Sequence, residues 1–224
     1  MSRAVQEMFG AIAPRYDVMN RLLSAGRDVS WRRVALGMLP HPPGRVLDLA
    51  TGTGELGAEA LAGGFAQRVI GADFCVPMLQ AGGRRWQAKR LSPAAADALH
   101  LPFAAASFDA AMVSYGWRNF DDPGEGLEQL HRVLKPGGTL IIVEFFRPQW
   151  WWPHVFHRGF SWTAPIMGAL FAGNGGAYAY LHRSIQGFLS VPEADQLLRQ
   201  HGFCNSRWHS FFGGISHAVA VQRR

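Results

Sequence analysis

The sequence predicts an α/β protein whose seven-stranded, mostly parallel sheet is covered by helices on both faces. Short apolar runs alternate with amphipathic stretches, and the most regular run, residues 45–50, leads into a glycine-rich turn. With 224 residues, 48% of them hydrophobic, the chain can build one full core. We therefore expect a single domain over residues 1–224, without internal repeats.

Residues 1–44 are expected to form a helical N-terminal cap. Its first helix is indicated by apolar residues at helical spacing: Phe9, Ile12, Ala13 and Tyr16. Asp28 is expected to cap a later helix over residues 29–39. The His-Pro-Pro-Gly sequence at 41–44 ends that helix and precedes the core.

Residues 45–146 are expected to form the core, with five strands and the helices between them. The strands are predicted at residues 45–50, 68–72, 91–96, 107–114 and 139–145. The helices are predicted at residues 75–88 and 123–134, and the second begins with Pro123. Pro93 weakens the third strand because proline donates no ladder hydrogen bond.

The chain becomes aromatic and basic after the fifth strand. Residues 147–190 are expected to form a helical, lid-like insertion over the strand edge. Residues 191–224 are expected to close the fold with a helix and a hairpin, at 192–201, 202–210 and 215–222.

The charge of the second half points to a surface partner. From Phe145 to Arg224 there are seven arginines, two acids and five of the eight tryptophans. Arginine beside tryptophan suits an anionic membrane surface, and it would also suit nucleic acid. The alternative is that the tryptophans are core residues and the arginines a solvated face. The apolar stretch 160–173 is too short to cross a bilayer.

The compartment follows from the cysteines and the N-terminus. Cys75 and Cys204 are far apart, so they suit buried thiols in a reducing cytoplasm, and no metal site is expected. No apolar signal stretch is present at the N-terminus. We expect a cytoplasmic protein with peripheral contact at the inner face of the plasma membrane and no nucleic-acid partner.

The segment 46–55 predicts a cofactor site. Glycines let the backbone approach a ligand, and the following helix offers unpaired N–H donors. Asp48 and Glu55 flank a loop without Lys or Arg, which favours a cationic cofactor such as S-adenosylmethionine over a pyrophosphate. A dinucleotide is the alternative, because three glycines also fit the weak pattern G-x-G-x-x-G: Gly52, Gly54 and Gly57.

Several segments carry a family resemblance. The most specific are Tyr16-Asp17 with Asn20, and Tyr-Gly-Trp-Arg-Asn at 115–119; Leu-Pro-Phe at 101–103 and Lys-Pro-Gly-Gly at 135–138 are more widespread. Together they resemble the S-adenosylmethionine-dependent C-methyltransferases of menaquinone and ubiquinone biosynthesis, the demethylmenaquinone and polyprenyl-methoxybenzoquinol methylases. The resemblance runs from Met8 to about Ala220. Glu55, where the family usually has aspartate, and Trp117, where it has a smaller aliphatic residue, depart from the pattern.

The resemblance implies a Rossmann-like fold that binds S-adenosylmethionine. Asp73, at the predicted end of the second strand, suits a carboxylate that accepts the ribose hydroxyls. Asp97 resembles the family residue that receives the adenine amino group, with the Ala98 backbone beside it. The cofactor-binding residues expected in this way are Asp48, Gly52, Thr53, Gly54, Asp73, Asp97, Ala98 and Ser114.

The implied chemistry is methyl transfer to a ring carbon of a polyprenyl quinol, in menaquinone or, less favoured, ubiquinone biosynthesis. Such transfer needs in-line alignment and removal of a quinol proton. Arg118 is the leading catalytic candidate, and Tyr16 is the second. An arginine, with a pKa above ~12, cannot act as a free base, but it can hold a phenolate or orient a water. Alternatively, Arg118 forms an ion pair that fixes its loop. The substrate-binding candidates are Tyr16, Asn119, His154 and Tyr178.

Other functions remain open at the sequence level. A methyltransferase for another lipid or small molecule, such as a sterol or a phospholipid amine, would have the same cofactor half. A nucleic-acid methyltransferase is disfavoured because the Asn-Pro-Pro-aromatic tetrad and a Pro-Cys pair are missing. The sequence does not decide between a naphthoquinol and a benzoquinol substrate, and it leaves the prenyl tail length and a homodimer undecided.

Overall fold

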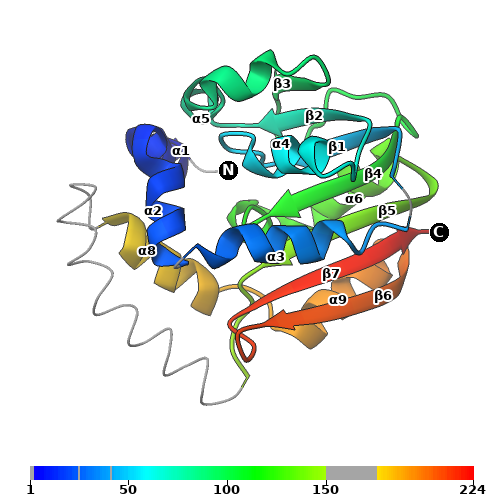
Figure 1. Cartoon of the computed structure of the whole chain (residues 1–224). Helices are drawn as coiled ribbons and strands as arrows, with labels where there is room; N and C mark the ends of the chain where they lie inside the picture. The colour runs from blue at the N-terminus through cyan, green and yellow to red at the C-terminus, as the bar shows by residue number, and fades with distance from the viewer. Residues whose placement is uncertain (1–2, 25, 41, 150–175) are drawn as a thin grey trace.

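The computed structural model describes the backbone at residues 3–24, 26–40, 42–149 and 176–224. Seven strands form one sheet in the order β3-β2-β1-β4-β5-β7-β6 (Figure 1). Only β7 runs antiparallel to its neighbours β5 and β6. The predicted fold class is therefore confirmed. The strands are β1 Arg45–Leu49, β2 Arg68–Asp73, β3 Leu91–Ala95, β4 Phe108–Ser114, β5 Leu134–Glu144, β6 Phe203–Phe211 and β7 Ser216–Arg223.

Helices precede the sheet, connect its strands and follow β5 (Figure 1). Two have clear start signals. Asp122 accepts the backbone N–H groups of the first turn of α6, and Ser190 forms a capping box with Glu193 at the start of α9. The α-helices are α1 Arg3–Ile12, α2 Tyr16–Leu23, α3 Arg27–Leu36, α4 Glu55–Ala62, α5 Val76–Ala81, α6 Pro123–Val133, α8 Gly176–Gln186 and α9 Val191–Gln200. The 3₁₀ turns are η1 Ala13–Arg15, η2 Gly83–Gln87 and η3 Trp117–Asn119.

Alternate residues of the central strands pack on opposite faces of the sheet. On one face, Leu47 and Leu49 join a core with residues of α6 and α9, including Leu127. On the other face, Val46 packs with Leu36 of α3 and with α4. Because successive side chains of a strand point to opposite faces, both faces of a parallel sheet are buried here.

Three sequence predictions need correction in detail. The helix expected at 75–88 is divided into α5 and η2, with Gly82 and Gly83 at the break. The fifth strand begins at Leu134, because the Lys-Pro-Gly-Gly segment already lies within β5. Asp28 does not cap α3, which begins after Gly26; the Asp28 carboxylate is buried and lies 3.0 Å from Nη1 of Arg32.

Most of the predicted insertion after β5, residues 150–175, lies outside the described residues. Its end is described as α8, which lies beside the N-terminal helices (Figure 1). In the part of the chain that is described, no helix combines the length and the apolar character needed to cross a bilayer. The division into cap, core, lid and closing segment stays a prediction.

Candidate functional site

The candidate site lies at the carboxyl end of the parallel strands, where β1 and β4 are neighbours. The strand order reverses direction between these two strands, and ligands of open α/β sheets bind at such switch points. Ala50 follows β1 with φ +56°, and Tyr115 follows β4 with φ +56°. A Cβ atom on Gly116 would clash with the Cβ of Ala50. Strained, tightly packed backbone of this kind is concentrated at functional sites.

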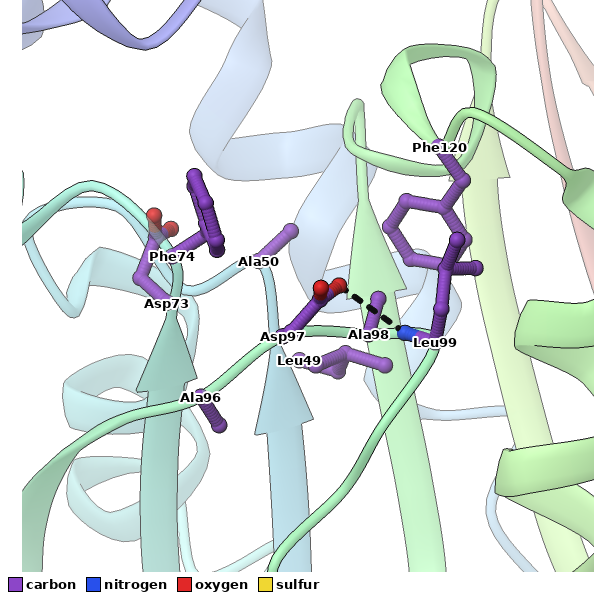
Figure 2. Close-up of a pocket in the computed structure, with 9 residues that line it drawn as sticks. All are labelled: Leu49, Ala50, Asp73, Phe74, Ala96, Asp97, Ala98, Leu99 and Phe120. Carbon is purple, nitrogen blue, oxygen red and sulfur yellow. Dashed lines mark hydrogen bonds between the residues drawn. The ribbon is translucent and has the colours of Figure 1, made fainter. Parts of the chain in front are cut away.

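A pocket opens at this edge between β1, β2 and the segment after β3 (Figure 2). Figure 2 shows Asp73 and Phe74 toward one end and Leu99 and Phe120 toward the other. Apolar side chains with two carboxylates suit a flat ring system that carries hydroxyl or amino groups. The lining residues are Leu49, Ala50, Asp73, Phe74, Ala96, Asp97, Ala98, Leu99 and Phe120.

Asp73 ends β2 with a nearly buried carboxylate. Its Oδ2 accepts the Gly52 N–H at 2.7 Å, and its Oδ1 accepts the Cys75 N–H at 2.8 Å. Burial raises the pKa of Asp73, and these backbone hydrogen bonds oppose that rise. A carboxylate has about four acceptor positions, so both oxygens keep capacity for ligand hydroxyls.

The loop after β1 depends on two glycines. Gly52 has φ +58° and Gly54 has φ +81°, backbone angles that residues other than glycine rarely adopt. A Cβ on Gly52 would lie 3.2 Å from Cε of Met78, and one on Gly54 would lie 2.6 Å from the Trp86 ring. The loop backbone can therefore lie against a ligand on one side and against Trp86 on the other.

The prediction that the acidic charge of Glu55 selects the cofactor is wrong, because the folded chain places arginines around Glu55. Glu55 lies 3.3 Å from Arg32, 3.4 Å from Arg85 and 3.7 Å from Arg21, so arginines from other segments neutralise it. Its charge is therefore not the feature that selects a cationic cofactor.

Asp48 accepts hydrogen bonds from both ends of the glycine loop. Its Oδ2 accepts the Thr51 hydroxyl at 2.6 Å and the Gly57 N–H at 3.0 Å. Burial raises the pKa of Asp48 to about 7. These contacts assign Asp48 to holding the glycine loop, and its direct contact with a cofactor stays a prediction.

The other predicted cofactor residues surround the same edge. The Thr53 hydroxyl donates to Oδ1 of Asp17 at 2.6 Å, and Ser114 is half-buried at the end of β4. Asp97 accepts the Leu99 N–H at 3.1 Å, and Ala98 lines the pocket beside it. The fold thus brings all the predicted cofactor residues to the carboxyl end of the sheet.

Aromatic residues of the cap and α8 cover this edge. The Phe9 ring centroid lies 6.1 Å from that of Tyr16 and 6.4 Å from that of Tyr180. Burial raises the pKa of Tyr16. The hydrogen bond to Asn20 and the charge of Arg118 lower this pKa, and the charge of Asp73 raises it. Tyr16 therefore belongs to the aromatic cluster at this end of the sheet.

Arg118 is held in a buried ion pair at the end of β5. Its Nη1 donates to Oε1 of Glu144 and to the Tyr115 carbonyl, both at 2.6 Å, and its Nε donates to Ser184 at 3.3 Å. The side chains of Arg118 and Glu144 are 6% and 0% exposed. Neighbouring Asn119 accepts the Tyr180 hydroxyl at 2.8 Å. The ion pair expected as the alternative for Arg118 is therefore present, with Glu144 as its partner.

The model of the ubiE/COQ5 methyltransferase family matches residues 1–222. The chain belongs to this family. It is 43% identical over 218 residues to a demethylmenaquinone methyltransferase of Deinococcus radiodurans, covering 96% of this chain and 90% of the relative. It is 45% identical over 191 residues to one of Thermus thermophilus, covering 84% and 86%. A ubiquinone/menaquinone biosynthesis C-methyltransferase UbiE of Geotalea daltonii is 38% identical over 219 residues, covering 95% of this chain and 93% of the relative. The predicted family and the methyltransferase activity are therefore confirmed.

Solved structures confirm the fold of this methyltransferase without deciding its substrate. A SAM-dependent methyltransferase of Thermotoga maritima superposes with a TM-score of 0.73 at 18% identity, covering 97% of this chain and 99% of that one. The [4+2]-cyclase SpnF superposes with a TM-score of 0.74 at 13% identity, covering 100% and 96%. One fold therefore carries different chemistries, and the side chains of the site decide between them.

The sequence analysis missed the roles of Glu144 and Asp17 in this methyltransferase. Glu144 could have been found, because a single acid ending an apolar strand is the same signal as Asp73. Asp17 had no such signal, because its partner Thr53 is distant in sequence. His154 and the side chain of Tyr178 lie outside the described residues. Within the described ranges, the acids, histidines and cysteines form no group of three suited to a metal ion.

Proposed function

We propose that this enzyme transfers a methyl group from S-adenosylmethionine to a ring carbon of a polyprenyl quinol, with demethylmenaquinol preferred over the ubiquinone precursor. The observation that carries the proposal is the common sheet edge shared by the carboxylate-lined pocket and the Tyr16, Arg118 and Asn119 side chains. The names of the relatives at 43% and 45% identity support the naphthoquinol substrate.

The chain's residues suit such a cofactor. Asp73 keeps acceptor capacity for sugar hydroxyls, and the Asp97 carboxylate, 34% exposed, suits an amino group. The positive-φ glycines Gly52 and Gly54 allow close backbone approach. We assign Thr53, Ala98 and Ser114 to the same site. The cofactor supplies the electrophilic methyl group, and the protein contributes its orientation.

The quinol must become nucleophilic at carbon, which requires loss of a phenolic proton. Among the described residues, the hydrogen bonds of Arg118 use Nη1 and Nε, so we assign Nη2 to the quinol oxygen. A guanidinium there stabilises the phenolate and can hold the water that takes up the proton. Tyr16, whose pKa is raised by burial, keeps its own proton and acts as a hydrogen-bond donor. Both groups therefore stabilise the quinolate without serving as the base.

Delivery of the quinol from a membrane is part of the proposal. The outer face of α2 exposes Val18 and Leu22, at 64% and 49%, and the side chain of Arg21 in the same helix is 50% exposed. Phe212 is 48% exposed, with the Arg27 guanidinium 5.2 Å from its ring centroid. Apolar tips among arginines suit an anionic lipid surface. Val18 and Leu22 are named the α2 face below.

Liposome flotation tests this contact. Vesicles with anionic lipid should capture the wild-type enzyme, and Val18→Ser/Leu22→Ser should reduce the captured fraction. Alanine at Trp150 to Trp152, which lie outside the described residues, should reduce it further. The control is Val76→Ser, which removes a 42% exposed valine of α5. Equal capture of all variants would refute membrane delivery through these residues.

Labelled methyl transfer into purified acceptors tests the reaction itself. Reduced demethylmenaquinone should accept label fastest, methoxybenzoquinol more slowly, and a phospholipid amine not at all. If a phospholipid amine accepted label faster than the quinols, the alternative, a methyltransferase for another lipid, would replace the proposed function. S-adenosylmethionine should raise the melting temperature, and NAD should not. The homodimer stays a prediction that light scattering decides.

A further inference from the structure

Asp17 joins three segments around the glycine loop. It lies in the first turn of α2, directly after Tyr16. Its Oδ1 accepts the Thr53 hydroxyl at 2.6 Å, and its Oδ2 lies 2.8 Å from Nη2 of Arg85 in η2. One carboxylate thus connects the cap, the glycine loop and η2.

These contacts differ from an ordinary surface ion pair. Exposed pairs contribute about 0–1 kcal/mol, but Thr53 is 3% exposed, and a 2.6 Å hydroxyl–carboxylate bond is a short, charge-assisted one. Arg85 also lies 3.4 Å from Glu55, which pairs with Arg32 of α3. Asp17 is therefore the end of a chain of charges that runs through α3, α4, η2 and α2.

Two consecutive cap residues lie beside two consecutive loop residues. The Tyr16 ring lies 3.9 Å from the position that a Cβ on Gly52 would take, while Asp17 binds Thr53. Side chains of adjacent helix residues point in different directions, so Tyr16 can face the site while Asp17 faces the loop. The conformation of the loop and the position of Tyr16 are therefore linked.

We propose that Asp17 is a positioning residue that couples occupation of the glycine loop to the seating of Tyr16. The inference rests on the proposed function. When the loop is ordered by S-adenosylmethionine, the Thr53 hydroxyl is held toward Asp17, and α2 is fixed with Tyr16 over the quinol. Cofactor binding then prepares the quinol site, and by reciprocity a bound quinol tightens cofactor binding.

Four variants separate coupling from stability. Thr53→Val removes the donor at nearly constant volume, and Thr53→Ser keeps it. Asp17→Ala removes the acceptor, and Asp17→Asn keeps an oxygen for Thr53 but loses the charge facing Arg85. The matched control is Asp195→Asn on α9, because Asp195 likewise binds an arginine, Arg199, and a neutral donor, Trp208.

The first measurement needs no quinol. Hydrogen exchange of residues 16–23 should slow when S-adenosylmethionine is added to the wild type, Thr53→Ser and Asp195→Asn. With S-adenosylmethionine at a concentration that saturates each variant, that protection should disappear in Thr53→Val and Asp17→Ala, and should be reduced in Asp17→Asn. Protection that survives in both Thr53→Val and Asp17→Ala would overturn the proposal. This result would hold even if the enzyme methylated a substrate other than a quinol.

The second measurement is steady-state turnover with the quinol. Thr53→Val and Asp17→Ala should each raise the quinol KM and lower kcat, with kcat/KM reduced about tenfold, and the double variant should be no worse than either. Asp195→Asn should leave both parameters at their wild-type values. Two outcomes would show that Asp17 acts only on stability. In one, the two single reductions of kcat/KM multiply in the double variant; in the other, Asp195→Asn reduces kcat/KM equally. No methyl transfer to any quinol by the wild type would instead refute the proposed function and leave the exchange result to decide the coupling.

Discussion

Glu144→Ala separates the two roles open to Arg118. The substitution leaves the Arg118 guanidinium buried at 6% exposure without the carboxylate that lies 2.6 Å away. Breaking a buried pair by removing one partner costs about 3–5 kcal/mol. For a domain of this size each kcal/mol lowers the melting temperature by about 2–4 °C, so a loss of about 6–20 °C is expected.

The double variant Arg118→Met/Glu144→Leu completes the test. Replacing both members of a buried pair by apolar residues is often close to neutral, so most of the lost melting temperature should return. Calorimetry should then show near-normal binding of S-adenosylmethionine, while turnover stays very low. Arg118→Lys, which keeps the charge but loses the planar fork, should also bind the cofactor and turn over slowly, with partial rescue at higher pH.

Two results would refute this reasoning. An unchanged melting temperature in Glu144→Ala would show that the ion pair carries little energy. Full turnover in the stable double variant would show that Arg118 is only structural, and the quinolate would need another partner.

Three further substitutions test the pocket and the loop. Asp73→Asn should weaken S-adenosylmethionine binding by about 1–3 kcal/mol, about 5- to 150-fold by calorimetry; wild-type affinity would remove Asp73 from the site. Gly116→Ala should lower the melting temperature by about 2–12 °C, because its Cβ overpacks against Ala50; no change would mean that the turn relaxes freely. Burial raises the pKa of Asp48 to about 7, so the folded state holds this proton more tightly than the unfolded state, and the stabilisation is lost as the pH rises from ~4 to 7. Asp48→Asn should therefore lose less stability than the wild type between about pH 5 and about pH 8 in urea unfolding, and parallel profiles would contradict this.

The sheet was predictable because its signals are local. Apolar runs bounded by glycine and proline locate most strands, except for the start of β5, which lies at Leu134 and not at residue 139. The parallel arrangement follows from the intervening helices. The end of β2 at Asp73 was predictable for the same reason. Pro93 was less of an obstacle than expected, because β3 is an edge strand.

The charges of the site were not predictable, because they depend on distant segments. Glu55 seemed to face a cofactor in a loop without Lys or Arg, whereas Arg32 arrives from the cap and Arg85 from η2. The contact of Asp17 with Thr53 has the same origin, since it forms only when the cap packs on the loop. Local sequence patterns predict strands and turns. Which side chains pair across distant segments is known only from the folded structure.

The reversed direction of β7 has a practical consequence. His217 pairs with Glu144 beside the site, whereas Gln222 pairs with Thr139 near the other end of the same two strands. Figure 1 shows the C-terminal residue at the end of the sheet opposite to α1, α2 and α8. A fluorophore or surface tether attached at Arg224 would leave the pocket and the α2 face unobstructed, so the enzyme could be immobilised in one orientation and presented to vesicles.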